Sequence, residues 1–129
     1  MARVLMIDDD KDMCEEMTDI LGSAGIEVTA VCDPAKGLKL TQAKKYDLFL
    51  IDLKMPKITG YEILRSIKDR DMKIKVMVIT GAPLNGIAGI ESNGEEKYRQ
   101  EILKLADEVV NKPVDIEYVI QKIRELTGE

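Results

Sequence analysis

Polar residues able to bind a cation or a phosphoryl group follow four apolar runs of the chain. Asp8–Asp10 follow the first run, Asp52 follows the second, Thr80 ends the third, and Lys112 comes just after the fourth. Carboxylates are ligands for hard cations such as Mg²⁺, and an ionised carboxylate can attack phosphorus to give an acyl phosphate. Phosphoryl transfer further needs a cation and a hydrogen-bond donor near the equatorial oxygens. Together these residues supply each part of such a site.

The apolar runs predict buried parallel strands, because they are short, continuous and bounded by polar residues. The predicted strands are Arg3–Ile7, Ile26–Val31, Leu48–Asp52, Lys75–Thr80 and Glu108–Asn111. A helix is expected after each strand. The predicted N-caps are Asp10, Asp33, Thr59 and Asp115, with Ser92–Glu95 for the fourth helix. Gly25 should end the first helix, the second should end near Lys44, and Gly81–Gly94 should form a long loop.

Five strands alternating with five helices predict an α/β fold with helices on both faces of a parallel sheet. The flavodoxin-like (βα)5, doubly wound five-stranded sheet with strand order 2-1-3-4-5 fits this count. In that order the carboxyl ends of the first, third, fourth and fifth strands meet at one edge. Taken singly, each polar residue has a simpler interpretation, such as a helix cap or a solvated loop cation. Their joint arrival at one edge favours a functional site.

The composition excludes several classes of protein. The 129 residues suggest one domain, and the net charge of −5 with a pI near 4.9 argues against nucleic-acid binding. No run is long enough for a membrane span, and no signal peptide is present, so a cytoplasmic protein is expected. The absence of histidine excludes a Ser-His or Cys-His pair and a His-ligated zinc site. Cys14 and Cys32 are predicted to be free, buried thiols.

This pattern resembles the receiver domain of two-component response regulators (CheY-like, stand-alone single-domain type) over nearly the whole chain. Asp8 and Asp9 match the acidic metal-binding pair of the family, and Asp52 within Asp52–Pro56, followed by Gly60, matches the phosphoacceptor motif. The resemblance also assigns four further roles. These are the hydroxyl switch residue Thr80, the phosphoryl-binding Lys112, the cis proline Pro113, and a backbone carbonyl of Lys54 offered to the metal.

The resemblance implies a function in a phosphorelay. Asp52 would accept a phosphoryl group from a phosphohistidine on a sensor histidine kinase or a histidine phosphotransfer protein, with Mg²⁺ (or Mn²⁺) required. Phosphorylation would draw Thr80 inward and alter the surface that an unknown downstream protein binds. The chain would not be an enzyme in the ordinary sense, since it would promote only its own phosphorylation and slow dephosphorylation. No nucleic-acid or membrane partner is implied.

The chain departs from the family pattern in three places. Val109 stands three residues before Lys112, where the family often has an aromatic switch residue, and Tyr98 is near in sequence but out of register. The chain from Thr80 to Lys112 is longer than usual, and we place the insertion in the loop 83–94. The third departure is the lack of an output domain, since we expect residues 1–129 to form a single receiver domain.

Three other functions can be weighed against this one. A small phosphohydrolase of the haloacid-dehalogenase type would need a second Asp two residues after its nucleophile, where Lys54 stands. A flavodoxin-like FMN carrier would need a phosphate-binding loop after the first strand, where three aspartates would repel phosphate. A receiver-shaped scaffold that is no longer phosphorylated stays open because of Val109, although the intact set of acids, Thr80 and Lys112 speaks against it.

Overall fold

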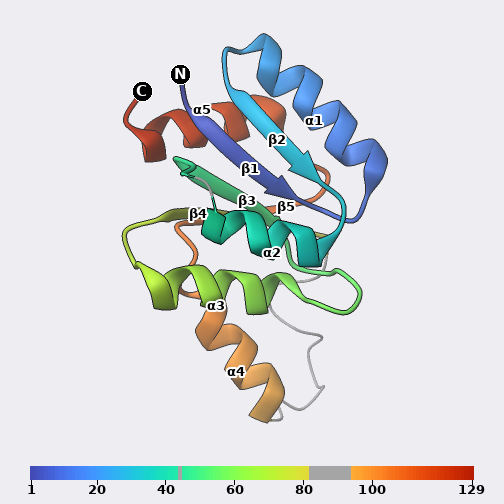
Figure 1. Ribbon diagram of the computed structural model, residues 1–129, viewed down its shortest axis with the longest axis vertical. Coiled ribbons are helices and arrows are strands. Elements are labelled where there is room, and N and C mark those ends of the chain that lie inside the picture. Colours follow the sequence, from blue (N-terminus) through green and yellow to red (C-terminus); the bar gives the residue numbers. More distant parts are fainter. Residues whose placement is uncertain (44, 82–93) are drawn as a thin grey trace.

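The computed structural model describes residues 1–43, 45–81 and 94–129, in which strands and helices alternate (Figure 1). The elements are β1 (Arg3–Ile7), α1 (Lys11–Ser23), β2 (Glu27–Val31), α2 (Pro34–Ala43), β3 (Leu48–Asp52), α3 (Gly60–Arg70), β4 (Lys75–Thr80), α4 (Gly94–Leu103), β5 (Glu108–Asn111) and α5 (Ile116–Thr127). Every predicted strand is present, and a helix follows each of them.

The strands form one parallel sheet in the order β2-β1-β3-β4-β5, which confirms the predicted fold. β1 lies between β2 and β3, where Ile7 is paired with Val31 on one side and with Ile51 on the other. β4 lies between β3 and β5, where Asp52 is level with Ile79 and Thr80 with Asn111. All five carboxyl ends therefore reach the same edge of the sheet.

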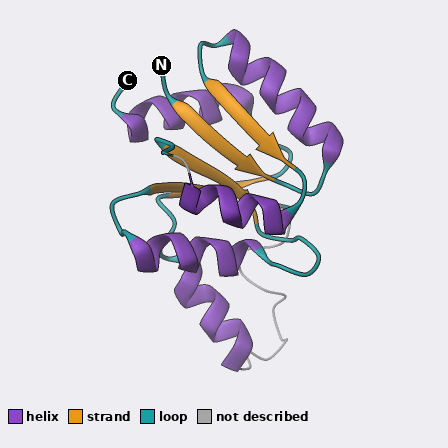
Figure 2. Ribbon diagram, viewed as in Figure 1, coloured by secondary structure: helices purple, strands orange, loops and turns teal. Residues whose placement is uncertain are grey.

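Helices cover both faces of the sheet, as Figure 2 shows. α1 and α5 lie on one face, where they bury Met17 and Val119 against alternate strand residues such as Leu50. α2, α3 and α4 lie on the other face, where Ile63 and its neighbours pack on Phe49. Successive residues of β3 thus belong to opposite cores, because side chains of a strand alternate between its faces. Such two-sided burial explains why the strands are continuous apolar runs.

Most of the predicted helix ends are found in the structure. The side chains of Asp10, Thr59 and Asp115 each accept a hydrogen bond from the main-chain N–H three residues later. Asp33 accepts one from the N–H two residues later. Gly25 has a φ of 84°, a conformation that glycine adopts without strain. It lies directly after the α1 cap and reverses the chain toward β2.

One predicted boundary is wrong, and others fall outside the described residues. β2 begins at Glu27 rather than at Ile26, because the main-chain N–H of Ile26 donates to Leu21 O and still closes the end of α1. α2 ends at Ala43, and Lys44 lies outside the described residues. Ser92 and most of the expected Gly81–Gly94 loop, including residues 83–93 of the expected insertion, also lie outside them. The described part of the chain contains no helix long and apolar enough to cross a membrane.

Candidate functional site

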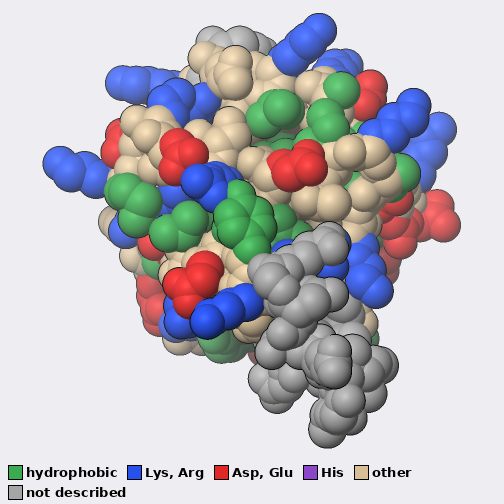
Figure 3. All heavy atoms as spheres, turned by 90° about the horizontal axis from the view of Figure 1, so that it is seen from below, with side chains coloured by type: hydrophobic (Ala, Val, Ile, Leu, Met, Phe, Trp, Pro, Cys, Tyr) green, Lys and Arg blue, Asp and Glu red, His purple; other side chains and the backbone are tan. Residues whose placement is uncertain are grey.

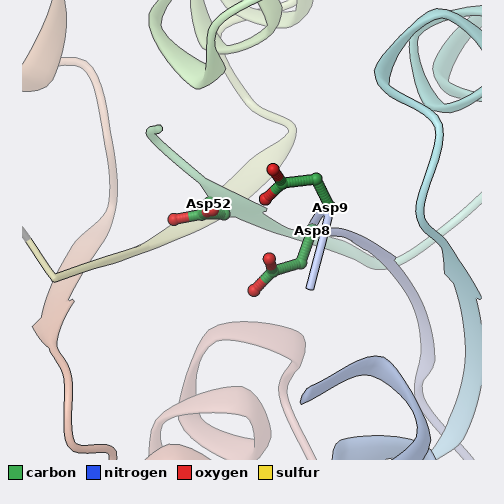
Figure 4. A group of neighbouring side chains, drawn as sticks. All are labelled: Asp8, Asp9 and Asp52. Carbon is green, nitrogen blue, oxygen red and sulfur yellow. The ribbon is translucent and has the colours of Figure 1, made fainter. Parts of the chain in front are cut away.

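Three carboxylates meet at the carboxyl edge of the sheet. Asp8 and Asp9 follow β1, Asp52 ends β3, and one oxygen of each lies within 4.8 Å of the others. Figure 4 shows these three side chains beside one another. Asp8 and Asp52 are only 1% and 5% exposed, whereas Asp9 is open to solvent. The structure therefore brings together the acids that the sequence selected, with two of them buried.

The main chain near Asp52 is held by a close approach of α3. Gly60, the first residue of α3, donates its N–H to Leu53 O at 3.0 Å. A Cβ atom at position 60 would meet the Asp52 carbonyl oxygen and would come within 2.7 Å of Leu53 Cα. Only glycine leaves room for this contact. The start of α3 is thereby pressed against the segment that carries Asp52.

Burial next to another acid makes the Asp52 carboxylate unfavourable to ionise. Desolvation of the carboxyl and the nearby charge of Asp8 raise the pKa of Asp52 to about 6. The Lys112 charge and a hydrogen bond from the main chain of Lys54 act in the opposite direction. A cation bound between these oxygens would offset the repulsion, and oxygen donors of this kind suit Mg²⁺.

Lys112 lies between the two buried acids. Its Nζ is 3.5 Å from Asp8 Oδ2 and 3.8 Å from Asp52 Oδ1. At these distances the contacts are electrostatic rather than short hydrogen bonds. Its own N–H donates to Thr80 O at 2.9 Å, and the Lys112–Pro113 peptide bond is cis. The side chain of Lys112 thus carries a positive charge from the end of β5 to the two buried acids.

The other expected site residues lie around this group. Thr80 ends β4 and is fully buried, one position beyond the residue paired with Asp52. The Lys54 side chain is exposed, and its main chain follows Asp52 closely. No acid stands at position 54, which is the place where a dehalogenase-type phosphohydrolase would need one.

The absent aromatic residue of β5 is not replaced by Tyr98. Val109 is partly buried and packs into the core on the α2, α3 and α4 face. Tyr98 lies on α4, where the Arg65 guanidinium of α3 sits 5.3 Å from its ring centre and donates to its hydroxyl. Tyr98 is thereby engaged with α3. A hollow of about 840 Å³ between these two helices also lies apart from the three carboxylates.

Sequence reasoning missed one neighbour of the acids. The Cys14 thiol donates to Asp8 O at 3.2 Å, so it touches the main chain of the acidic cluster. The sequence predicts Cys14 only as a free, buried thiol. Cys32 directly follows β2, and this position at the carboxyl edge of a strand is the signal that could have drawn attention to the thiols.

Comparison with known proteins identifies a family and confirms the fold. A family model described as "Response regulator receiver domain" matches residues 4–124. The transcriptional regulator RpaA of Synechocystis sp., named as DNA-binding, is 29% identical over 130 residues, covering 98% of this chain and 49% of RpaA. The cell cycle response regulator CtrA of Brucella ovis is 33% identical over 89 residues, covering 69% of this chain and 36% of CtrA. The chain spans half or less of these curated relatives.

Solved structures agree over nearly the full length. The receiver domain of Francisella response regulator 1452 has a TM-score of 0.80 and 26% identity, covering 99% of this chain and 98% of that one. A CheY-like receiver domain protein of Methanospirillum hungatei has the same TM-score and identity, covering 99% and 94%. TrrA of Thermotoga maritima, in complex with Mg(2+)-BeF, has a TM-score of 0.80 and 24% identity, covering 98% and 99%.

Proposed function

The chain belongs to the response regulator receiver domain family, and from this premise we propose that Asp52 is its phosphoacceptor. The observation that carries the proposal is the grouping of Asp8, Asp9 and Asp52, with the Lys112 ammonium between two of them. This arrangement holds a carboxylate nucleophile next to a cation site and a fixed positive charge. We assign residues 1–129 to a single receiver domain, with an insertion in the loop 83–94.

In the proposed reaction an oxygen of the Asp52 carboxylate attacks the phosphorus of a phosphohistidine. The new O–P bond forms as the P–N bond breaks, and the electron pair of that bond returns to the imidazole. The donor would be a sensor histidine kinase or a histidine phosphotransfer protein, so we place the chain in the cytoplasm. The acyl phosphate is later hydrolysed slowly. The chain is thus a phosphoacceptor that promotes its own reaction rather than an enzyme that acts on a separate substrate.

Receiver domains bind Mg²⁺ at an acidic pocket, and the residues of this chain fit the ion. The carboxylates of Asp8, Asp9 and Asp52 and the main-chain carbonyl of Lys54 would hold it, and Mn²⁺ fits the same oxygen donors. When bound, the metal supplies positive charge for the phosphoryl oxygens. The two buried acids support this assignment, because burial and the nearby Asp8 charge raise the pKa of Asp52, and Lys112 offsets this only in part.

The remaining residues stabilise the phosphoryl group and couple its presence to the surface that a downstream protein binds. We assign Lys112 to one phosphoryl oxygen and the Thr80 hydroxyl to another. The Lys112 N–H is bonded to Thr80 O, so an inward movement of Thr80 also acts on the loop that follows β5. With Val109 in place of an aromatic residue, this main-chain link is the route we propose from Asp52 to the surface that a downstream protein binds.

The proposal is tested by intact-mass measurement after incubation with acetyl phosphate and Mg²⁺. We expect a gain of one phosphoryl mass, which is absent in Asp52→Asn and in a sample with excess chelator. Asp12→Asn is the matched control, because Asp12 is an exposed acid at the start of α1. It should gain the phosphoryl group as the parent does. Phosphate retained by Asp52→Asn would refute the assignment.

A further inference from the structure

The two cysteines lie side by side, although they are 18 positions apart in the sequence. Cys14 is near the start of α1 and only 3% exposed, while Cys32 directly follows β2 and is half-buried. The Cys14 thiol is 4.0 Å from Val31 O, the residue before Cys32. The nearby Cys32 thiol is, after burial, one of the causes that raise the pKa of Cys14. The structure thus pairs a covered thiol with one nearer to solvent.

Both thiols line one surface hollow between α1 and β2. The hollow measures about 530 Å³, and Lys11, Glu15 and Thr18 form part of its wall. Figure 1 shows α1 running alongside β2, so the hollow lies between neighbouring elements at the edge of the sheet. A small polar molecule that enters it meets the half-buried Cys32 before the covered Cys14. The face viewed from the α4 end in Figure 3 is a mixture of acidic, basic and hydrophobic side chains.

We propose that Cys14 and Cys32 form an oxidation site, at which a hydroperoxide converts the two thiols into a disulfide. The Cys32 sulfur first attacks the O–O bond of the hydroperoxide, which forms a sulfenic acid and releases the alcohol, or water from hydrogen peroxide. The Cys14 sulfur then attacks the Cys32 sulfur, and the S–O bond breaks with loss of water. Two thiols and one hydroperoxide thus give one disulfide, one alcohol and one water.

The surroundings of the pair support this order of events. Exposure decides which sulfur meets the oxidant first, since Cys14 is buried and Cys32 is only half-buried. Burial, followed by the hydrogen bond to Cys32, raises the pKa of Cys14 to about 12, as expected for two thiols in contact. Disulfides in a reducing compartment are mostly transient and redox-sensing. A pair of this kind would therefore respond to a pulse of oxidant rather than stabilise the fold permanently.

Oxidation would also act on the acidic cluster, a consequence that rests on the proposed function. The Cys14 S–H donates to Asp8 O, and the Asp8 N–H donates to Val31 O at 3.2 Å. Disulfide formation removes the S–H donor and ties the start of α1 to the end of β2. The turn that carries Asp8 and Asp9 is thereby drawn toward β2. We expect the oxidised chain to bind Mg²⁺ more weakly than the reduced chain.

The first experiment treats the reduced chain with hydrogen peroxide and measures intact mass, free thiols and cross-linked peptides. We expect the loss of two hydrogens and of both titratable thiols, with residues 14 and 32 joined. Cys32→Ser should keep its single thiol, because the remaining sulfur is covered. Cys14→Ala should instead yield a sulfenic acid at Cys32 that dimedone traps. Two thiols that remain free, or oxygen added to Cys32 without a cross-link, would overturn the proposal.

The second experiment compares the rise in Tm that Mg²⁺ causes in the reduced and oxidised chains. A rise in the reduced chain that becomes smaller after oxidation and returns with dithiothreitol is the expected result. An equal rise in both forms would reject the coupling to the acidic cluster and leave the proposed phosphoacceptor role intact. No rise in the reduced chain would instead count against the metal site itself. Cys32→Ser, treated with the same peroxide, should show the full rise.

Discussion

Lys68 and Asp107 form a partly buried ion pair at the edge of the sheet opposite to Asp52. Lys68 Nζ lies 2.8 Å from Asp107 Oδ2, and the lysine side chain is only 2% exposed. The same ammonium donates to the main-chain carbonyls of Met72 and Ile74, and the same carboxylate oxygen accepts the N–H of Val76. This pair therefore joins the end of α3 to the first residues of β4 and to the residue before β5.

Replacing Lys68 by methionine should lower the free energy of unfolding by about 1–3 kcal/mol, because it leaves two main-chain carbonyls and a carboxylate without their shared donor. Urea unfolding of Lys68→Met and the parent measures this change. Lys104→Met is the matched control. Lys104 pairs with Glu101 at 3.3 Å on the exposed surface, where an ion pair contributes at most about 1 kcal/mol. Equal effects of the two variants would contradict a special role for the Lys68–Asp107 pair.

Much of the site could be predicted from the sequence, because it depends on where apolar runs stop. A strand buried on both faces is a continuous apolar run, so its end is visible as the first polar residue. Asp52 and Thr80 were found in this way, and the common direction of parallel strands explains why they share an edge. The topology rule for alternating strands and helices then predicts correctly which strands lie next to one another in the sheet.

Contacts between side chains that are distant in sequence could not be predicted in the same way. Lys68 stands in a polar stretch at the end of α3, and its partner lies 39 residues later. No feature of the neighbouring sequence distinguishes such a buried lysine from a solvated one. The thiol contact of Cys14 with Asp8 O and the pairing of Tyr98 with Arg65 depend likewise on how helices pack. Only the tertiary arrangement reveals them.

Gly60→Ala should destabilise the chain by about 1–3 kcal/mol, the usual range for forced overpacking. The added methyl group would collide with the Asp52 carbonyl oxygen and Leu53 Cα. Gly22→Ala is the control, since a Cβ there has no neighbour within 4 Å and alanine favours the helix by about 0.5–1 kcal/mol. Urea unfolding should therefore show opposite signs for the two substitutions. A Gly60→Ala variant as stable as the parent would mean that the contact is not tight.

Asp52 should make stability fall as the pH rises from about 4 to about 6 in the absence of Mg²⁺. The pKa of Asp52 is about 6 in the folded chain and has its usual value of 3.8 when unfolded. The folded chain therefore holds this proton more tightly, and ionisation at higher pH favours unfolding. Asp52→Asn lacks this penalty, so its stability relative to the parent should increase by on the order of 2 kcal/mol between pH 4 and pH 7.

Urea unfolding of both proteins at several pH values, with chelator present, gives this difference. Asp12→Asn is the reference for an exposed acid, and its stability relative to the parent should stay nearly constant over the same range. If the difference between Asp52→Asn and the parent did not grow with pH, the Asp52 carboxylate would not carry an unfavourable charge. The interpretation of the acidic cluster as a cation site would then lose its electrostatic basis.

Lys112→Met should strengthen Mg²⁺ binding and weaken phosphorylation. The ammonium lies 3.5 Å from Asp8 Oδ2, so it offsets the negative charge that a metal would otherwise neutralise. Its removal should favour the metal by about 1 kcal/mol, measured as a lower Mg²⁺ concentration at the midpoint of the Tm rise. Asp9→Asn provides the reference in which this rise is lost.

The same substitution removes the cation that we assign to a phosphoryl oxygen. The rate of phosphoryl uptake from acetyl phosphate should then fall by about a hundredfold, the effect of losing one group that stabilises a transition state. Lys122→Met is the matched control. The Lys122 side chain on α5 is also 29% exposed, but it pairs with Glu108 of β5 rather than with the acidic cluster. Lys122→Met should change neither the Mg²⁺ midpoint nor the rate of phosphoryl uptake. Tighter metal binding together with slower phosphoryl uptake would show that the Lys112 charge acts on the transferred group. If Lys112 merely stabilised the fold, its loss would weaken metal binding and slow uptake alike.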